Sequence, residues 1–436
     1  MENNTQELEL PQGVTPDFLL SQLRQRFNKL SDHRASNSSF HLTDMLMSGF
    51  AMFSLKYASL LQFETQTEVE RVNLHQLYGI KQLCTDSQMR KVLDLVNPND
   101  LKAMYAENFQ QLQRLGITEA YRSYRDYLIV AIDGVTHFES KKVNCPCCLV
   151  KTHKEASISY SHSMLCAMLV KPGQKEVFVM GTEPILCQDG QEKNDCERSA
   201  SKRLLDEMAL HYQDEKLLIT EDALYSTGPN ITQITENNWS YVLGIKPEGN
   251  KTLFKCFDEQ QPSHRAKKFA YVEKGVNHQF KYVNNLPLNG TNAQLRVNVL
   301  LYEQTDKQGK TTKFSWVTNL VLDRKSALEV MKIGRSRWKI ENETFNTLKN
   351  QGYQFEHNYG HGKKNLSTVL AYLMLLAFHT DQLIQRCNPS FQKIWKAAKT
   401  KTKLWQTQRA LFMVHIFLSF QQLYYTMAAL FKVKLE

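Results

Sequence analysis

Between residues 127 and 245 the sequence alternates short apolar runs with amphipathic stretches, a pattern that few folds can accommodate. The first apolar run is continuous, partly β-branched and followed by Asp133-Gly134, which is typical of a buried strand. We predict, in chain order, strands at Tyr127–Ile132, Ser157–Val170 and Glu176–Met180, a helix at Asp195–His211 opened by Asn194 or Asp195, a strand at Lys216–Thr220, a short helix around Ile231 and a strand at Trp239–Ile245. Elements in this order predict an α/β unit built on one sheet.

The predicted order of strands and helices is that of a ribonuclease-H-like core. The sequence on either side of this core predicts the other domains. Residues from about 15 to 120 show helical periodicity with scattered Arg and Lys, so they form either a DNA-binding domain or simply a basic helical bundle. Beyond residue 247 the sequence is strand-like and turn-rich, with strands predicted at Phe269–Val272, Gln279–Val283, Arg296–Leu301 and Lys313–Val317, and helix resumes near Asp323. The predicted divisions are an N-terminal helical, DNA-binding domain at 1–122, the first part of the core at 123–246, a β-rich insertion at 247–322, the last part of the core at 323–385 and a C-terminal helical region at 386–436.

The net charge of the chain indicates the class of partner, and its cysteine content indicates the cellular compartment. The chain has 54 Lys and Arg against 44 Asp and Glu, a net charge of +10, which favours nucleic acid over a membrane surface. Met1–Pro11 is acidic and polar, unlike a signal or transit peptide, and the apolar runs Thr368–Phe378 and Ala410–Phe431 are expected to be buried or docking helices. An odd number of mostly scattered cysteines, 9 in all, predicts a reducing cytoplasm.

The segment from Gly334 to Lys349 places one carboxylate between two cations at helical spacing. Arg337 precedes Glu341 by one helical turn, and Lys349 follows it by about two. A lone acid between bases suits a metal-bound carboxylate beside a phosphate backbone. Alternatively, the segment is a surface helix whose ion pairs contribute only about 0.2–0.5 kcal/mol each. The apolar residues expected to pack this helix are Trp338, Ile340, Phe345 and Leu348.

Two more acids stand at the ends of predicted strands. Asp133 follows the first strand and Asp222 follows the fourth, and the ends of neighbouring strands in an open sheet converge on one crevice. Together with Glu341 they predict a site for two Mg²⁺ ions, which accept carboxylate, water and phosphate oxygens. Asp133 and Asp222 each have an ordinary alternative. Asp133-Gly134 is alternatively a turn after the strand, and Asp222 is alternatively a cap of the turn that follows it. Glu221, beside Asp222, is a competing candidate for the site.

These residues resemble those of bacterial insertion-sequence transposases of the DDE type, in the group with a β-rich insertion and a Tyr-Arg-Glu-Lys signature. The resemblance runs from about residue 30 to 385. It rests on Ile132–Gly134, Lys193–Glu197, Asp222–Tyr225, Trp316–Thr318 and Arg337–Asn342.

The resemblance implies that Asp133, Asp222 and Glu341 are catalytic and bind two Mg²⁺ ions, for which Mn²⁺ can substitute. The enzyme would nick transposon ends by hydrolysis and join the freed 3′ ends to target DNA, with a hairpin route open. Arg337 and Lys349 would contact phosphates, and a flipped base would stack on Trp316 unless that residue is a core Trp in a strand. The resemblance also implies that the protein acts as a homodimer on paired double-stranded DNA ends. The implied location is the bacterial cytoplasm, in association with the nucleoid and not with a membrane.

The sequence departs from the signature at two positions. Gly334 stands where the Tyr is expected, three residues before Arg337. Leu348 stands where the Lys is expected, so Lys349 matches only after a shift of one residue.

Two further motifs stand outside this pattern. Cys145 and Cys148 form a C-x2-C pair that predicts either a structural Zn²⁺ site or a reduced cysteine cluster, with His153, His162 and Cys166 as candidate further ligands. Glu356–Gly362 is a polar, aromatic segment expected to be a turn between helices, or to approach the DNA.

Two functions from other classes compete with an active transposase. One is a transposase-derived DNA-binding protein without catalysis, which the presence of all three acids disfavours. The other is a ribonuclease-H-like nuclease without strand transfer, which the insertion and the basic tail disfavour.

Overall fold

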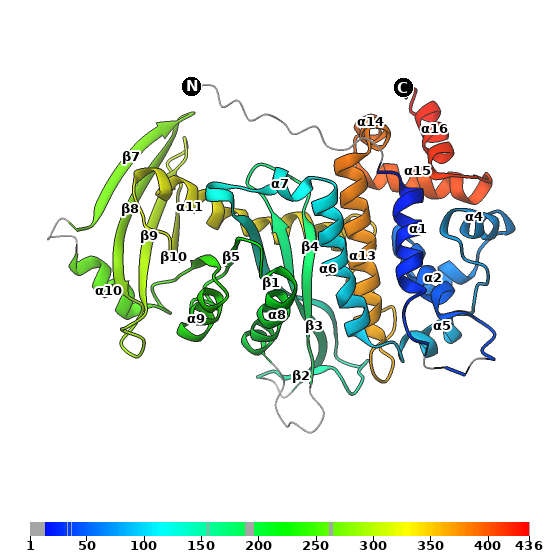
Figure 1. The fold of residues 1–436 in the computed structure, drawn as a ribbon, viewed down its shortest axis with the longest axis horizontal. Helices are drawn as coiled ribbons and strands as arrows, with labels where there is room; N and C mark the ends of the chain where they lie inside the picture. Colours follow the sequence, from blue (N-terminus) through cyan, green and yellow to red (C-terminus); the bar gives the residue numbers. More distant parts are fainter. Residues whose placement is uncertain are drawn as a thin grey trace.

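A computed structural model describes residues 14–32, 34–35, 37–154, 157–187, 196–260 and 265–435. It is a mixed α/β structure in which helices from both ends of the chain pack together at one end and a long sheet occupies the rest (Figure 1). The predicted helical character of residues 15–120 is confirmed. The N-terminal helices are α1 (Pro16–Phe27), α2 (Leu42–Ser54), α3 (Leu60–Glu64), α4 (Glu68–Tyr78), α5 (Asp86–Leu93), α6 (Pro98–Arg114) and α7 (Ile117–Tyr121).

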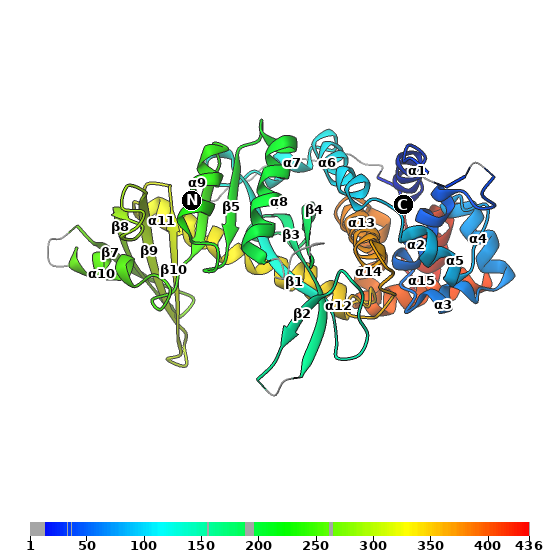
Figure 2. The ribbon, with the colours of Figure 1, turned by 90° about the horizontal axis from the view of Figure 1, so that it is seen from below.

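The predicted strands and helices between residues 127 and 245 are present in the predicted order, together with one short strand, β2, that was not predicted. Its first part has the strand order β4-β3-β1-β5-β6, in which β1 runs antiparallel to β3 and parallel to β5, and β5 runs parallel to β6. Helices α8 and α9 cover one side of the sheet and α11 the other (Figure 2). The elements are β1 (Leu128–Ser140), β2 (Leu149–Thr152), β3 (Ile158–Val170), β4 (Phe178–Ile185), α8 (Glu197–Tyr212), β5 (Leu217–Glu221), α9 (Gly228–Glu236) and β6 (Ser240–Gly244).

Strand β1 is longer than the apolar run that predicts it. Pairing with β3 continues from Ile129 opposite Val170 to Ser140 opposite Tyr160, so the expectation that the strand ends at Asp133 is wrong. The parallel pairing with β5 stops at Ala131 opposite Thr220. Strand β1 therefore extends beyond β5, and past Ala131 its backbone pairs with β3 alone. The alternative interpretation of Asp133-Gly134 as a turn is wrong for the same reason.

Residues 247–322 extend the same sheet instead of forming a separate one. Strand β10 pairs with β6, and the order continues β10-β9-β8-β7, all antiparallel. The four predicted strands are confirmed with longer bounds, but a helix, α10 (Lys251–Glu259), precedes them and was not predicted. The strands are β7 (Lys267–Glu273), β8 (Val276–Pro287), β9 (Arg296–Thr305) and β10 (Thr311–Thr318).

The C-terminal part returns to helix, as predicted. Helix α11 (Arg324–Ser336) begins at the capping residue Asp323, and a π-helical segment, η2 (Ile340–Phe345), continues it into α12 (Asn346–Asn350). Helix α13 (Leu366–Cys387) packs against α2, α6 and β4. The remaining helices are α14 (Pro389–Ala398), α15 (Lys401–Val414) and α16 (Phe420–Leu430).

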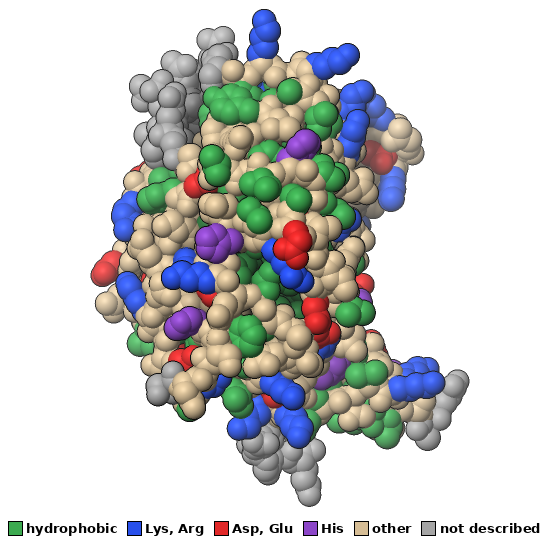
Figure 3. Space-filling view, turned by 90° about the vertical axis from the view of Figure 1, so that its right-hand side faces the viewer, with side chains coloured by type: hydrophobic (Ala, Val, Ile, Leu, Met, Phe, Trp, Pro, Cys, Tyr) green, Lys and Arg blue, Asp and Glu red, His purple; other side chains and the backbone are tan. Residues whose placement is uncertain are grey.

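Helix α13 has the length and composition of a membrane span, with a mean hydropathy of 1.2 in its most apolar window. That window is 89% buried inside the protein, as expected for a core helix. The second apolar run is interrupted, because α15 ends at Val414 and α16 begins at Phe420. Figure 3 shows the helical end of the molecule. Among the described residues on this face, Lys and Arg side chains are scattered among acidic and apolar ones and form no continuous stripe.

Candidate active site

Asp133 and Asp222 lie near the same edge of the sheet because β1 and β5 are parallel neighbours. Asp222 comes directly after β5 and Asp133 lies two residues beyond the last β1–β5 pair. On its other side Asp133 is opposite Cys166 of β3. Parallel strands present their carboxyl ends at one crevice, and this pair of acids occupies that position.

The structure distinguishes Asp222 from its neighbour Glu221. Glu221 is buried within β5, where it accepts hydrogen bonds from Asn230 at 2.6 Å and Ser201 at 3.3 Å. Burial raises the pKa of the Glu221 carboxyl to about 8, so this group is mainly protonated at pH 7. Asp222 is half-buried, and its Oδ1 accepts the Leu224 N–H at 2.8 Å in a turn. Asp222 can therefore cap this turn through Oδ1 and also take part in the site.

Glu341 reaches Asp133 through Arg337. The Arg337 guanidinium donates to Asp133 Oδ2 at 2.5 Å and to Glu341 Oε1 at 2.8 Å, and η2 lies against β1. Burial raises the pKa of Asp133 to about 6; Arg337 and the Gly134 N–H oppose this, while the charges of Glu341 and Asp222 add to it. Arg337 thus joins Asp133 and Glu341 directly, and Asp222 lies close enough for its charge to act on Asp133.

Carboxylate oxygens are the donors that Mg²⁺ prefers, so Asp133, Asp222 and Glu341 fit this ion. Arg337 was expected to contact a phosphate, but here its cation lies between two of the carboxylates and offsets their repulsion. Divalent cations bound to the same carboxylates would offset that repulsion in place of Arg337. A guanidinium released in this way is a good phosphate ligand because its fork of donors matches two oxygens.

Lys349 lies on the wall of a groove that Glu341 also lines. Its Nζ forms an ion pair with Glu356 Oε1 at 2.7 Å, a contact that was not predicted. The π-helical turn of η2 contains Glu341 and precedes Lys349, and such a turn inserts one extra residue into a helix. Leu348 is thereby buried and Lys349 reaches the groove.

Trp316 is not available for stacking with a base in this structure. Its ring is 5% exposed in β10 and stacks parallel to Phe314, with centroids 5.7 Å apart, as the alternative of a core Trp predicts. Trp338, which follows Arg337 in the sequence, is 50% exposed, although the sequence had suggested that it packs the helix. The other apolar residues expected to pack it, Ile340, Phe345 and Leu348, are buried.

Gly334 is required where the signature has Tyr. A Cβ atom at this position would lie 2.3 Å from Trp316 Nε1 and 2.4 Å from its Cε2, closer than atoms can approach. The Trp316 ring therefore occupies the space beside the helix that a side chain at residue 334 would need.

We expect Gly334→Ala to destabilise the protein despite the higher helix propensity of Ala. Overpacking costs about 1–3 kcal/mol, against about 1 kcal/mol gained in propensity. Thermal melting should show a lower Tm, and the drop caused by Gly334→Ala should be smaller in a Trp316→Leu background, where the clashing ring is absent. Gly290→Ala is the matched control, since a Cβ there meets nothing within 4 Å. Equal melting of the 334 and 290 variants would contradict the packing argument.

Glu197, the first residue of α8, is a fourth acid near the site that was not predicted as a site residue. A Cβ at Gly134 would lie 2.8 Å from its Oε1, and the Tyr225 hydroxyl donates to its Oε2 at 3.2 Å. The segment Lys193–Glu197, noted for its resemblance to the transposase pattern, was the one available signal. Its residues 193–195, including the predicted helix openers Asn194 and Asp195, lie outside the described residues.

Comparison with known proteins gives a family match for part of the chain. The family model described as "Transposase DDE domain" matches residues 171–378, just under half of the chain, a range that includes Asp222 and Glu341. One solved structure, a cryo-EM structure of the piggyBac transposase synaptic complex with hairpin DNA, is 10% identical with a TM-score of 0.43. That match covers 96% of this chain and 80% of the other. No curated protein matches the chain.

Proposed function

We propose that this protein is a DNA transposase that cleaves the ends of its element by Mg²⁺-dependent hydrolysis and joins the 3′ ends to target DNA. The observation that carries the proposal is the joining of Asp133 and Glu341 through one guanidinium, with the charge of Asp222 acting on the same site. The match of residues 171–378 to a transposase domain supports the choice of DNA as substrate. The strand order β4-β3-β1-β5-β6 supports a ribonuclease-H-like core, with residues 247–322 as its insertion.

In this proposal Asp133, Asp222 and Glu341 hold two Mg²⁺ ions, for which Mn²⁺ can substitute. When bound, such a pair of ions activates water and stabilises the leaving 3′ oxygen. Arg337 orients the Asp133 and Glu341 carboxylates before the ions arrive and contacts a phosphate afterwards. Lys349 contacts the DNA backbone along the groove after a phosphate replaces Glu356 as its ion-pair partner.

The partners follow from the same chemistry. A net charge of +10 favours double-stranded DNA, and joining two ends at one target requires two active sites, hence a homodimer in the synaptic complex. Hairpin formation is one route for the second strand, but no Tyr hydroxyl stands at residue 334 to assist it. We place the protein in the bacterial cytoplasm with the nucleoid, and its element among insertion sequences.

The decisive experiment uses DNA that carries the inverted repeats bordering the gene. Purified protein is incubated with this DNA, a target plasmid and Mg²⁺, and Asp133→Ala is run in parallel. Cleavage and joining by the wild type alone support transposition. Cleavage without joining would identify a nuclease, and binding without cleavage would identify a derived DNA-binding protein; either result would refute the proposal.

We expect Lys349→Ala to weaken DNA binding and to reduce the salt dependence of the binding constant by about one phosphate contact. Glu356→Gln should do the opposite, because it releases Lys349 from its ion pair. Both are measured by DNA titration at several salt concentrations. An unchanged slope in Lys349→Ala would remove this residue from the DNA contacts.

A further inference from the structure

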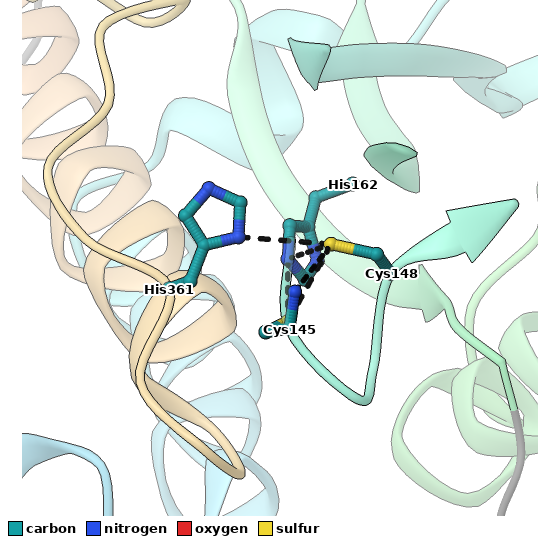
Figure 4. Close-up of side chains that lie close together, drawn as sticks. All are labelled: Cys145, Cys148, His162 and His361. Carbon is teal, nitrogen blue, oxygen red and sulfur yellow. Dashed lines mark hydrogen bonds between the residues drawn. The ribbon is translucent and has the colours of Figure 1, made fainter. Parts of the chain in front are cut away.

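Two cysteines and two histidines from distant parts of the chain meet beside the groove (Figure 4). Cys145 and Cys148 lie in the turn between β1 and β2, His162 lies on β3, and His361 lies in the segment between α12 and α13. The four candidate ligand atoms lie within 4.8 Å of one another. Of the three candidates predicted to complete the C-x2-C pair, only His162 is in this cluster; His153 instead bonds to Ser159, and Cys166 faces Asp133 across the β-ladder.

The separations are close to those of ligands around one tetrahedral ion. With metal–sulfur bonds near 2.3 Å and metal–nitrogen bonds near 2.0–2.1 Å, two sulfurs should be about 3.8 Å apart and a sulfur and a nitrogen about 3.6 Å. Cys145 Sγ and Cys148 Sγ are 3.5 Å apart. His162 Nε2 is 3.2 and 3.4 Å from these two sulfurs, and His361 Nδ1 is 3.6 Å from Cys148 Sγ.

The loop geometry also suits a thiolate. The Cys145 N–H donates to Cys148 Sγ at 3.3 Å, and the Cys148 N–H closes the turn on the Cys145 carbonyl at 3.1 Å. Cys148 and His162 are buried, and Cys145 and His361 are half-buried. The site is therefore closed on the side of the sheet, and its four ligands leave no position open for a substrate.

We propose that Cys145, Cys148, His162 and His361 bind one structural Zn²⁺ ion. Two sulfurs and two imidazole nitrogens in tetrahedral reach form the Cys₂His₂ set that zinc prefers, and Mg²⁺ has no affinity for such donors. This site is separate from the acid site and does not depend on the proposed DNA chemistry.

The ion would fix the wall of the groove beside Glu341. His361 packs edge-on against Phe138 of β1, with centroids 4.1 Å apart, and Phe138 and Glu356 both line the groove. The segment that carries His361 is held on its other side by Asp94, whose carboxylate accepts the N–H groups of residues 363–366 at 2.8–3.0 Å. Zinc would thus tie the β1–β2 turn to the chain that leaves the Glu341 helix.

Metal analysis of the full-length protein tests the proposal. The protein is purified without a histidine tag or chelator, and zinc is measured by mass spectrometry; one ion per chain is expected. Cobalt-substituted protein should show the intense visible bands of tetrahedral Co²⁺ and thiolate charge transfer. Removal of the metal by a strong chelator should lower the Tm, and added Zn²⁺ should restore it.

Four variants distinguish zinc held by this cluster from zinc held elsewhere on the protein. Cys148→Ser and His361→Asn should each lose the bound ion and the cobalt spectrum. Cys147→Ser should keep both, because Cys147 lies in the same turn but outside the cluster, and Ser can still donate to the Lys364 carbonyl as the thiol does at 3.2 Å. Asp222→Asn should also keep the zinc, which shows that the ion is not at the acid site.

The proposal is overturned if the wild-type protein holds less than about a tenth of an ion per chain after exposure to Zn²⁺ under reducing conditions. It is also overturned if His361→Asn retains a full equivalent with an unchanged cobalt spectrum. A Cys145–Cys148 disulfide in protein handled anaerobically would count against it equally, since the thiolates would then be consumed.

Discussion

Asp222→Asn is expected to reduce DNA-end cleavage by about a thousandfold while leaving the fold and DNA binding nearly unchanged. A bound metal pair contributes several kcal/mol of transition-state stabilisation, and about 4 kcal/mol corresponds to three orders of magnitude in rate. The substitution is conservative for the fold, because the Asn side-chain oxygen can still accept the Leu224 N–H as Asp222 Oδ1 does. Single-turnover cleavage and a DNA-binding titration measure the two effects separately.

Glu221→Gln is the matched control for this prediction. The two acids are adjacent in sequence, but Glu221 is buried, bonded to Asn230 and Ser201, and mainly neutral at pH 7 because its pKa is about 8. Its amide replacement should therefore change cleavage by less than about threefold. Equal losses in both variants would indicate that the Asp222 effect is structural, and parallel loss of DNA binding would indicate the same.

Asp381→Asn is expected to destabilise the protein by about 3–5 kcal/mol, because it leaves a buried ammonium group without its counter-ion. Lys56, after the end of α2, has its Nζ 2.6 Å from Asp381 Oδ2 on α13, and the two side chains are 4% and 11% exposed. Burial lowers the pKa of Lys56, whereas Asp381 opposes this shift, so the charge of Lys56 depends on its partner. The Tyr353 hydroxyl donates to the same carboxylate oxygen.

Urea unfolding of four proteins measures this contact: the wild type, Asp381→Asn, Lys56→Met and the double variant Lys56→Met/Asp381→Leu. The double variant should recover most of the loss, since it leaves no buried charge unpaired. The contact joins helices at opposite ends of the chain, so the result also tests their packing. A loss below about 1 kcal/mol in Asp381→Asn would contradict the buried position of the pair.

Local patterns in the sequence were sufficient for most elements of the sheet. Continuous apolar runs mark β1 and β5 because both faces of these strands are covered by helices. The end of β1 was misjudged because Asp133 interrupts the apolar run, whereas backbone pairing with β3 decides where the strand ends. Helix α10 was missed because its sequence lies among strands and turns.

The proximity of Asp133 to Asp222 could be predicted from the sequence, because both follow apolar runs of parallel strands, but several contacts around them could not. Arg337 and Glu341 are one helical turn apart, so their contact follows from periodicity, whereas the contact of Arg337 with Asp133 requires η2 to lie against β1. No periodic rule would anticipate the π-helical turn that brings Lys349 to the groove. His361 is far from His162 in the sequence, and only the folded chain shows that both face Cys148.

Iron-directed cleavage of the polypeptide tests most directly whether the three acids share one metal site. Fe²⁺ bound in place of Mg²⁺ generates hydroxyl radicals with peroxide and ascorbate, and these radicals cut only nearby backbone. Protein preloaded with Zn²⁺ to block the cysteine cluster should be cut near residues 133, 222 and 341 together. Mg²⁺ should suppress all three cuts, and Asp222→Asn should abolish them. Cutting confined to one of these segments, or cutting that Mg²⁺ leaves unchanged, would contradict a shared site.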